Sequence, residues 1–312
     1  MTLRDHPALA GLTVLERGWL SSNNVLVHPQ GEEAGATLID SGHVAHSEQT
    51  LALVRHSLQG RALTRVVNTH LHSDHCGGNA ALQRAFGAKV FVPPGQAEAV
   101  RTWDTQALSY APTGQRCERF VLHGVLPPGD LLEAGGRQFE VLAAPGHDPH
   151  SVVLFDRHHG LLISADALWE NGFGVVFPEL EGESAFDDVG AVLDLIEKLP
   201  VALVVPGHGG VFSDVPAALS RARSRLAVFK ANPMRHARYA AKVLLSYHLL
   251  EEHSTTLAHL REWAERTPLF LSVWGRVGST ESEAPGEWSD LLVGELVAGG
   301  AARRVGDQVI AA

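Results

Sequence analysis

Short apolar stretches bounded by turn residues alternate with helical periodicity through the first two-thirds of the chain. Thr64 to Thr69 is rich in β-branched residues and predicts a strand, and Ala88 to Val92 predicts the next one. Asn79 is placed to cap a short helix between them, and Gly87 is placed to end it. We expect further strands over residues 24–27, 36–39, 138–142, 151–156, 160–164 and 201–205, the first two as an antiparallel pair. Strands that alternate with helices predict an α/β fold.

From about Asp214 the apolar residues take up helical spacing. Asp214 and Pro216 open one amphipathic helix, which Asn232-Pro233 stops. We expect three more helices, with Tyr239, Val243, Tyr247 and Leu250 on one face of the first, Thr256 capping the second, and Ser289 capping the third before Gly299-Gly300. Residues 301–310 predict a small hairpin. The sequence therefore predicts an α/β domain over residues 1–214 and a helical, winged-helix-like domain over residues 215–312.

The composition is that of a globular protein with a sizeable core, with 45% hydrophobic residues in 312. The formal charge of -10 argues against nucleic acid as the main partner, because phosphate binding normally draws on a basic surface. Two cysteines, Cys76 and Cys117, are too few for a secreted disulfide scaffold. No signal peptide or membrane span is evident, so we expect a cytoplasmic protein without membrane attachment.

Residues with metal-ligand chemistry follow the predicted strands. His70, His147, Asp166 and His208 each come just after one. Loops at strand ends, held by a rigid sheet, are where catalytic groups are commonly found. This placement favours one shared site over scattered surface residues.

The run from Thr69 to His75 concentrates this chemistry. Residues two apart on a strand point the same way, so His70 and His72 can face one ion. Asp74 and His75 follow at the turn, where the chain can bend round a second position. In a chain with 18 histidines, a lone His-x-His would more often be a surface strand pair. The longer pattern His-x-His-x-Asp-His favours a metal site, because imidazole and carboxylate groups suit zinc, iron and manganese.

In these residues the sequence resembles the metallo-β-lactamase-fold hydrolase superfamily. The second motif of the family matches the run that contains His70, His72, Asp74 and His75. The remaining motifs are matched in family order, over about 170 residues, by Asp40 in Leu38-Ile39-Asp40-Ser41-Gly42, by Pro145-Gly146-His147, by Asp166 in Ile163-Ser164-Ala165-Asp166, and by Pro206-Gly207-His208.

The resemblance implies a four-layer αββα sandwich with two metal positions. Its ligand pattern assigns His70, His72 and His147 to the first ion, Asp74, His75 and His208 to the second, and Asp166 to a bridge between them. Asp40 would orient the histidine loop through hydrogen bonds. Zinc is the first expectation for the two divalent ions, with iron and manganese as alternatives.

Such a site predicts hydrolysis. A water that bridges the ions, its pKa lowered toward about 7, would supply hydroxide, and the ions would polarise the substrate carbonyl. Asp74 would act catalytically by orienting this nucleophile and passing its proton toward the leaving group. Gly77-Gly78-Asn79 resembles the glyoxalase-II-type and related thioester or ester hydrolases, although basic residues of a glutathione site are not evident near the C-terminus. The first prediction is therefore hydrolysis of a small ester, thioester or lactone.

Three aromatic residues are predicted to contact the substrate. Trp169 and Phe173 lie just beyond Asp166 in the sequence. Tyr110 belongs to an irregular, polar run over residues 96–119, which either covers the site or packs onto the core. For Cys76, a role as a small buried residue is favoured over a reactive thiol.

Two other activities stay open. Arg221 to Leu226 and Asn232 to His236 resemble the helical extension of a subgroup with a β-lactamase-like endoribonuclease, which makes a nuclease or phosphodiesterase one alternative. The module from residue 215 holds twelve Lys and Arg against ten Asp and Glu, so shaping the site rim or a homodimer interface fits it better than duplex binding. A mononuclear iron dioxygenase of the same fold is the other alternative. We expect a small-molecule substrate and no nucleic acid partner.

Overall fold

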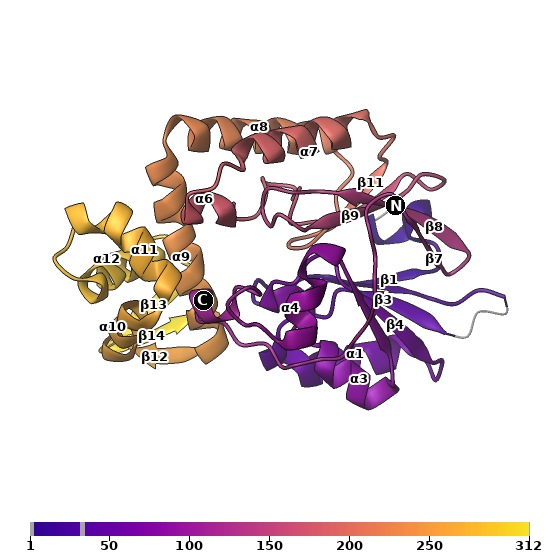
Figure 1. Cartoon of the computed structure of the whole chain (residues 1–312), viewed down its shortest axis with the longest axis horizontal. Coiled ribbons are helices and arrows are strands. Elements are labelled where there is room, and N and C mark those ends of the chain that lie inside the picture. The colour runs from indigo at the N-terminus through magenta and orange to yellow at the C-terminus, as the bar shows by residue number, and fades with distance from the viewer. Residues whose placement is uncertain (1–2, 32–34, 312) are drawn as a thin grey trace.

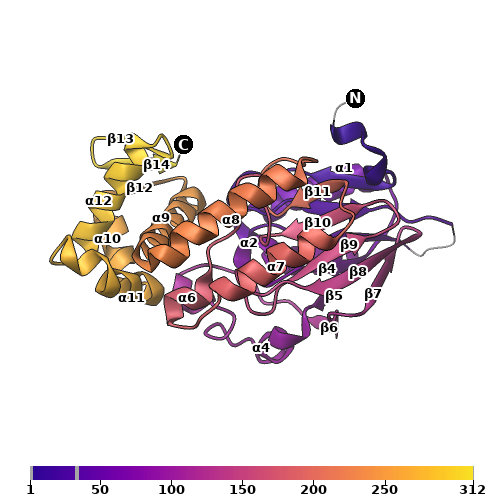
Figure 2. The same cartoon turned by 90° about the horizontal axis from the view of Figure 1, so that it is seen from above.

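The computed structural model describes residues 3–31 and 35–311. Two β-sheets lie face to face, and helices cover their outer faces (Figures 1 and 2). The first sheet has the strand order β1-β2-β3-β4-β5-β6, and the second has the order β11-β10-β9-β8-β7. The predicted four-layer α/β sandwich is therefore confirmed.

The first sheet and its helices come from the N-terminal part of the chain. Its strands span Leu12–Leu15 (β1), Asn24–Val27 (β2), Ala36–Ile39 (β3), Leu63–Val67 (β4), Lys89–Val92 (β5) and Leu122–Val125 (β6). The helices in this part span Ser47–Leu58 (α1), Ser73–Cys76 (α2), Asn79–Phe86 (α3), Ala97–Thr102 (α4) and Tyr110–Thr113 (α5). The expected antiparallel pair is β2 and β3, with Val25 opposite Ile39.

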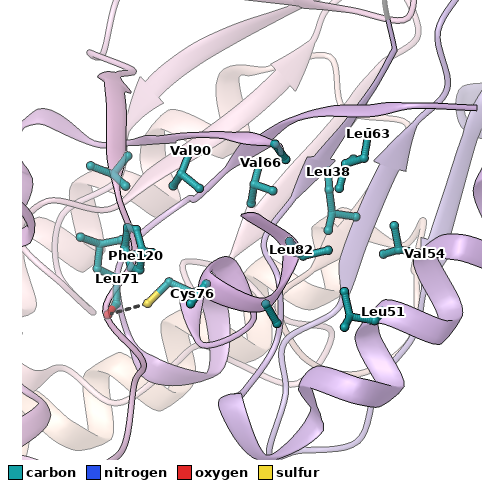
Figure 3. Packing of buried hydrophobic residues seen from close by; sticks show 14 of the residues in the cluster. Leu38, Leu51, Val54, Leu63, Val66, Leu71, Cys76, Leu82, Val90 and Phe120 are labelled. Atoms are coloured by element: carbon teal, nitrogen blue, oxygen red, sulfur yellow. Dashed lines mark hydrogen bonds between the residues drawn. The ribbon is translucent and has the colours of Figure 1, made fainter. Parts of the chain in front are cut away.

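Successive residues of β3 pack into two different hydrophobic cores. Leu38 of β3 lies in one cluster with Leu51 of α1 and Leu82 of α3 (Figure 3). The next residue, Ile39, lies in the core between the sheets together with Phe139. Side chains alternate along a strand, so this sheet is covered by helices on one face and by the second sheet on the other.

The second sheet spans Leu131–Ala134 (β7), Arg137–Ala143 (β8), Val152–Asp156 (β9), Leu161–Ala165 (β10) and Leu203–Pro206 (β11). Every residue of β9, β10 and β11 is buried, which explains their continuous apolar sequence. Helices Phe177–Glu181 (α6), Phe186–Lys198 (α7) and Val215–Ala231 (α8) follow, and α7 and α8 cover the outer face. α8 packs against α7 in the same core, although it begins after residue 214. The domain boundary at residue 214 therefore stays a prediction.

The last part of the chain forms helices and a small antiparallel sheet, lying beside the sandwich in Figure 1. Its helices span Pro233–Glu252 (α9), Leu257–Arg266 (α10), Pro268–Arg276 (α11) and Pro285–Ala298 (α12). Its strands span Ser254–Thr256 (β12), Ala302–Val305 (β13) and Gln308–Ala311 (β14), in the order β12-β14-β13. The helical character and the hairpin are confirmed, while a winged-helix-like arrangement stays a prediction.

The predicted helix caps agree with the structure in part. Asp214 and Thr256 accept backbone N–H groups at the starts of α8 and α10, as expected. Ser289 is not a cap, because α12 already begins at Pro285 and Ser289 is buried within it. Asn79 is not the cap of α3 either. It is the first helical residue, and its side-chain amide donates to Asn68 instead.

No helix in the described ranges is both long and apolar enough to cross a bilayer.

Candidate metal centre

The loops that follow β4, β8, β10 and β11 bring their histidine and aspartate side chains together. Among the described residues, two groups of candidate ligand atoms converge, and within each group the atoms lie within 4.8 Å of one another. The first group is His70, His72 and His147, and the second is Asp74, His75, Asp166 and His208. All seven residues singled out from the sequence therefore meet at one place, and all are buried except the half-buried His72.

In the first group, hydrogen bonds direct ring nitrogens toward a common point. Nδ1 of His72 lies 2.8 Å from Nε2 of His147. On the other side of its ring, Nδ1 of His147 donates to the carbonyl oxygen of Val175 at 2.5 Å. Because a neutral imidazole carries one proton, this bond leaves the lone pair on Nε2 of His147. The ring is thus oriented and held in the tautomer that a metal ligand needs.

In the second group, the carboxylate of Asp40 orients the ring of His75, as the carbonyl oxygen of Val175 orients that of His147. Its Oδ2 lies 2.8 Å from Nδ1 of His75, so that Nε2 of His75 faces the other ligands. The same carboxylate accepts the backbone N–H of Thr69 at 2.9 Å and its hydroxyl at 2.8 Å. Asp40 thereby ties the histidine loop to the end of β3 and orients His75 through direct contact.

Asp166 belongs to the second group and also approaches the first. One of its oxygens, Oδ2, is 3.3 Å from Nε2 of His147, and the other, Oδ1, is 3.4 Å from Nε2 of His75. Gly207 leaves room for the carboxylate of Asp166, because a Cβ atom at residue 207 would come within 2.2 Å of Oδ1 of Asp166. The glycine beside His208 is therefore required by packing.

Electrostatics prepare the site for a cation. Burial and the neighbouring histidines lower the pKa of His70 well below its usual value, and burial and His147 lower that of His72 to about 4. Burial alone would raise the pKa of Asp74 and of Asp166, but the neighbouring histidines, His75 first, outweigh it and lower both. Conversely, Asp74, Asp166 and Asp40 outweigh burial and raise the pKa of His75 well above its usual value. The neutral imidazoles of His70 and His72 thus stand beside ionised, buried carboxylates, whose charge a metal ion can balance.

The residues fit a divalent metal on two further grounds. Nε2 of His70 is buried and has no hydrogen-bond partner in the described part of the chain, which is unusual for a buried polar atom unless it has another ligand. Imidazole and carboxylate groups are also the ligands that zinc, iron and manganese accept.

Tyr247 on α9 is a residue of the site that the sequence did not indicate. Its hydroxyl donates to Oδ2 of Asp74 at 3.1 Å and lies 3.4 Å from Nε2 of His208. Burial and the charges of Asp74 and Asp166 raise the pKa of Tyr247 well above its usual value, so the hydroxyl keeps its proton. In the sequence it is one of several apolar-face residues of a helix, and only the tertiary structure brings it to the metal-ligand cluster.

A second residue that the sequence did not indicate is Trp19. Its ring stacks on His208 with a centroid distance of 5.5 Å and an interplanar angle of 10°. The ring of Trp169 lies 5.5 Å away, at a steep angle to it. Trp19 is 56% exposed, an unusual position for so large an apolar ring, and it forms part of the entrance to the site.

A pocket of about 530 Å³ opens beside the two ligand groups and is lined by residues of both the sandwich and α9. Trp169 lines it, as predicted, together with Val175, Phe177, Val243 and Leu250. The walls are therefore largely apolar near the metal ligands and suit an apolar substrate group.

Two predicted substrate contacts need correction, because the structure places neither on the wall of this pocket. Phe173 is fully buried and packs on Phe229, with ring centroids 6.2 Å apart. The hydroxyl of Tyr110 donates to the carbonyl oxygen of Leu71 at 2.9 Å, and its ring is buried. Both side chains contribute to packing behind the site. Sequence proximity to Asp166 could not reveal this, because the chain turns inward after Trp169.

Comparison with known proteins agrees with this geometry. The sequence model of the metallo-beta-lactamase superfamily matches residues 17–208. The chain is 30% identical over 164 residues to human acyl-coenzyme A thioesterase MBLAC2, a match that covers 47% of this chain and 56% of that protein. It is 29% identical over 216 residues to a hydroxyacylglutathione hydrolase of Polaromonas sp., covering 67% and 71%. The chain thus spans little more than half the length of MBLAC2.

A solved structure resembles the whole chain, including the C-terminal helices. A metallo-beta-lactamase family protein of Thermus thermophilus superposes with a TM-score of 0.56 and 21% identity. The match covers 97% of this chain and 99% of that one. The likeness concerns the fold, and it places the helical C-terminal part within a known architecture.

Proposed function

The chain belongs to the metallo-beta-lactamase superfamily, and from this premise we propose that it is a dinuclear metal-dependent hydrolase of a small ester, thioester or lactone. The observation that carries the proposal is the pair of complete ligand groups with Asp166 between them. A mononuclear iron dioxygenase would need only one of these groups. Retention of the second group therefore favours the dinuclear hydrolase.

We propose that His70, His72 and His147 hold one ion, that Asp74, His75 and His208 hold the other, and that Asp166 bridges them. When bound, two divalent ions supply a water of lowered pKa and polarise a carbonyl group. Zinc is the proposed metal, and iron and manganese accept the same ligands.

The chain's own side chains then orient the reactants. Asp74 is positioned to accept a proton at Oδ2, where Tyr247 and His208 already approach it. The neutral hydroxyl of Tyr247 supports the ionised form of Asp74 and lies beside the pocket. Trp169 donates its indole N–H to Oδ1 of Asp166 at 3.2 Å and so holds the bridging carboxylate in place. These contacts favour one fixed geometry for attack on a carbonyl carbon.

The apolar pocket and the relatives together favour a thioester. One of the relatives described above is named as an acyl-coenzyme A thioesterase and the other as a hydroxyacylglutathione hydrolase. Val175, Phe177 and Leu250 provide an apolar wall for an acyl chain next to the ligand groups. We propose that the acyl part of the substrate lies along this wall.

Single-ligand variants test the assignment. His72→Ala and His75→Ala remove one proposed ligand from the first and the second group, and His158→Ala, in an exposed turn outside both groups, is the matched control. We expect each ligand variant to lose metal by elemental analysis and to lose hydrolysis of a thioester, whereas the control keeps both. Full metal content in both ligand variants would contradict the two-ion assignment. Turnover of RNA or a phosphodiester, but not of thioesters or lactones, would identify a nuclease instead.

A further inference from the structure

A second, basic hollow lies next to the metal-site pocket. It has a volume of about 530 Å³ and lies between α8 and α9. Four of the described residues that line it are basic, and none of them is acidic. We call this hollow the basic groove, after Arg225, Arg235, Arg238 and Lys242. In a chain with a formal charge of -10, such a concentration of positive charge needs an explanation.

Only part of this charge is neutralised by the protein. Arg238 forms ion pairs with Glu281 and Glu295, and Lys242 lies 3.2 Å from the same Glu295. In the described part of the chain, Arg225 and Arg235 have no ion-pair partner. Within the same ranges, the Arg225 side chain makes one long hydrogen bond, 3.5 Å, to the carbonyl oxygen of Asn171. The groove therefore offers two uncompensated guanidinium groups to a ligand.

Arg225 is held in a fixed orientation. Its guanidinium carbon lies 4.5 Å from the ring centre of Tyr239 and 5.7 Å from that of Phe173. Gly172 leaves room for it, because a Cβ atom there would come within 2.6 Å of its Nη1. A guanidinium group that is already oriented loses little entropy when it binds an anion. This packing also gives Phe173 a role, as support for Arg225.

The basic groove and the metal-site pocket adjoin. Tyr239 and Lys242 line both of them. Along α9, Tyr247 marks the metal centre, Lys242 lies five residues before it, and Arg235 lies twelve residues before it. With a rise of 1.5 Å per residue, the basic groups lie roughly 7 to 18 Å from the metal centre along the helix axis. A ligand in both hollows must carry its anionic group on a spacer of that length.

We propose that the basic groove binds phosphate on the leaving group of the substrate, so that the substrate is an acyl thioester whose thiol carries a phosphate or diphosphate at the end of an extended linker. This inference rests on the hydrolase activity proposed above. Guanidinium groups bind phosphate through paired N–H donors, and the apolar pocket takes the acyl part. In the reaction, a C–O bond forms between water and the acyl carbon and the C–S bond breaks. One proton of the water goes to the thiolate, and the other is released to solvent as the product ionises to a carboxylate.

A long polyanion fits the groove less well than one small ligand. The module from residue 215 holds twelve basic against ten acidic residues, and apart from the four basic residues of the groove its acidic residues outnumber its basic ones. Nucleic acid binding normally uses a basic surface that follows many phosphates.

One acyl group attached to different thiols tests the inference. The same acyl group is presented to the metal-loaded enzyme on coenzyme A, on 4′-phosphopantetheine and on N-acetylcysteamine, which carries no phosphate. We expect kcat/KM to fall in that order, with a gap of about tenfold or more between the first thiol and the last. Equal values for all three thioesters would overturn the phosphate site and leave the hydrolase proposal intact.

Charge variants locate the effect. Arg235→Glu places an acid in the first turn of α9, where it is compatible with the helix. Arg225→Met removes the guanidinium group that lies over the ring of Tyr239 and leaves an unbranched apolar side chain in its place. Arg61→Glu, exposed and outside both hollows, is the matched control for net charge. We expect the ratio of kcat/KM for the phosphate-bearing thioester to that for the phosphate-free one to fall about tenfold in each groove variant and to stay constant in Arg61→Glu. An unchanged ratio in Arg235→Glu would contradict the inference.

A binding measurement separates this inference from the proposed reaction. Calorimetry with a non-hydrolysable thioether analogue of the coenzyme A thioester reports binding even if no thioester is hydrolysed. Binding that Arg235→Glu weakens would support the phosphate site whatever the reaction. Absence of binding to the wild-type enzyme, or an effect of Arg235→Glu on single-stranded RNA alone, would overturn it.

Discussion

Replacing Tyr247 with phenylalanine removes a hydroxyl group that helix α9 contributes to the metal centre. In the structure this hydroxyl donates to Oδ2 of Asp74 at 3.1 Å. Hydrogen bonds to charged groups typically contribute about 1.5 to 3 kcal/mol. Because His208 also approaches the same oxygen, at 2.9 Å, we expect the loss to fall at the lower end of that range. About 1.5 kcal/mol corresponds to roughly a tenfold fall in kcat/KM.

The assay compares Tyr247→Phe with Tyr110→Phe. Tyr110 is the matched control because its hydroxyl is also buried and donates to a backbone carbonyl, but it lines no part of the metal-site pocket. Each variant is measured for thioester hydrolysis, metal content and thermal unfolding. We expect both to keep their metal and to lose a little stability, and only Tyr247→Phe to lose activity. Equal activity in the two variants would refute a role for Tyr247 beyond packing.

Three further changes have defined outcomes. Asp40→Asn is expected to weaken metal binding about 10- to 100-fold, since it alters the hydrogen bond that orients His75; metal affinity equal to wild type in a competition titration would refute this. Gly207→Ala is expected to lower metal content together with stability, because its Cβ would collide with Asp166, and elemental analysis with thermal unfolding checks both. Burial lowers the pKa of His236 to about 4, so its neutral form stabilises the fold fully above about pH 6.5 and the contribution falls as pH drops toward 4, by roughly 3 kcal/mol at most. Urea unfolding at pH 7 and pH 4.5 should show a smaller pH dependence in His236→Gln than in the wild type, and equal dependence would contradict the assignment.

The strands and the ligand cluster could be predicted from the sequence because local signals carry them. Continuous apolar runs over β9, β10 and β11 indicate strands buried on both faces, and turn residues mark their ends. Asp166 and His208 follow the ends of β10 and β11, and His70 follows the end of β4, so the topology of the sheets was enough to bring them together.

The prediction that was wrong and the features that the sequence did not indicate depend on tertiary contacts. Phe173 follows Asp166 closely in the sequence, yet it turns into the core and supports Arg225. Tyr247 looks like any residue on the buried face of a helix until α9 is docked on the sandwich. Likewise, charge counted over the whole C-terminal module is near neutral, and only packing of α8 against α9 gathers Arg225 and Arg235 in one groove.

The central claim is that two metal ions act together in hydrolysis. The most direct measurement is a titration of metal-free enzyme with zinc, in which bound metal and thioester hydrolysis are recorded at each addition. We predict that binding saturates at about two ions per chain, as expected for two complete ligand groups, and that activity reaches its maximum only with the second. Saturation at one ion, or full occupancy of both positions without hydrolysis of any thioester, ester or lactone, would contradict the account.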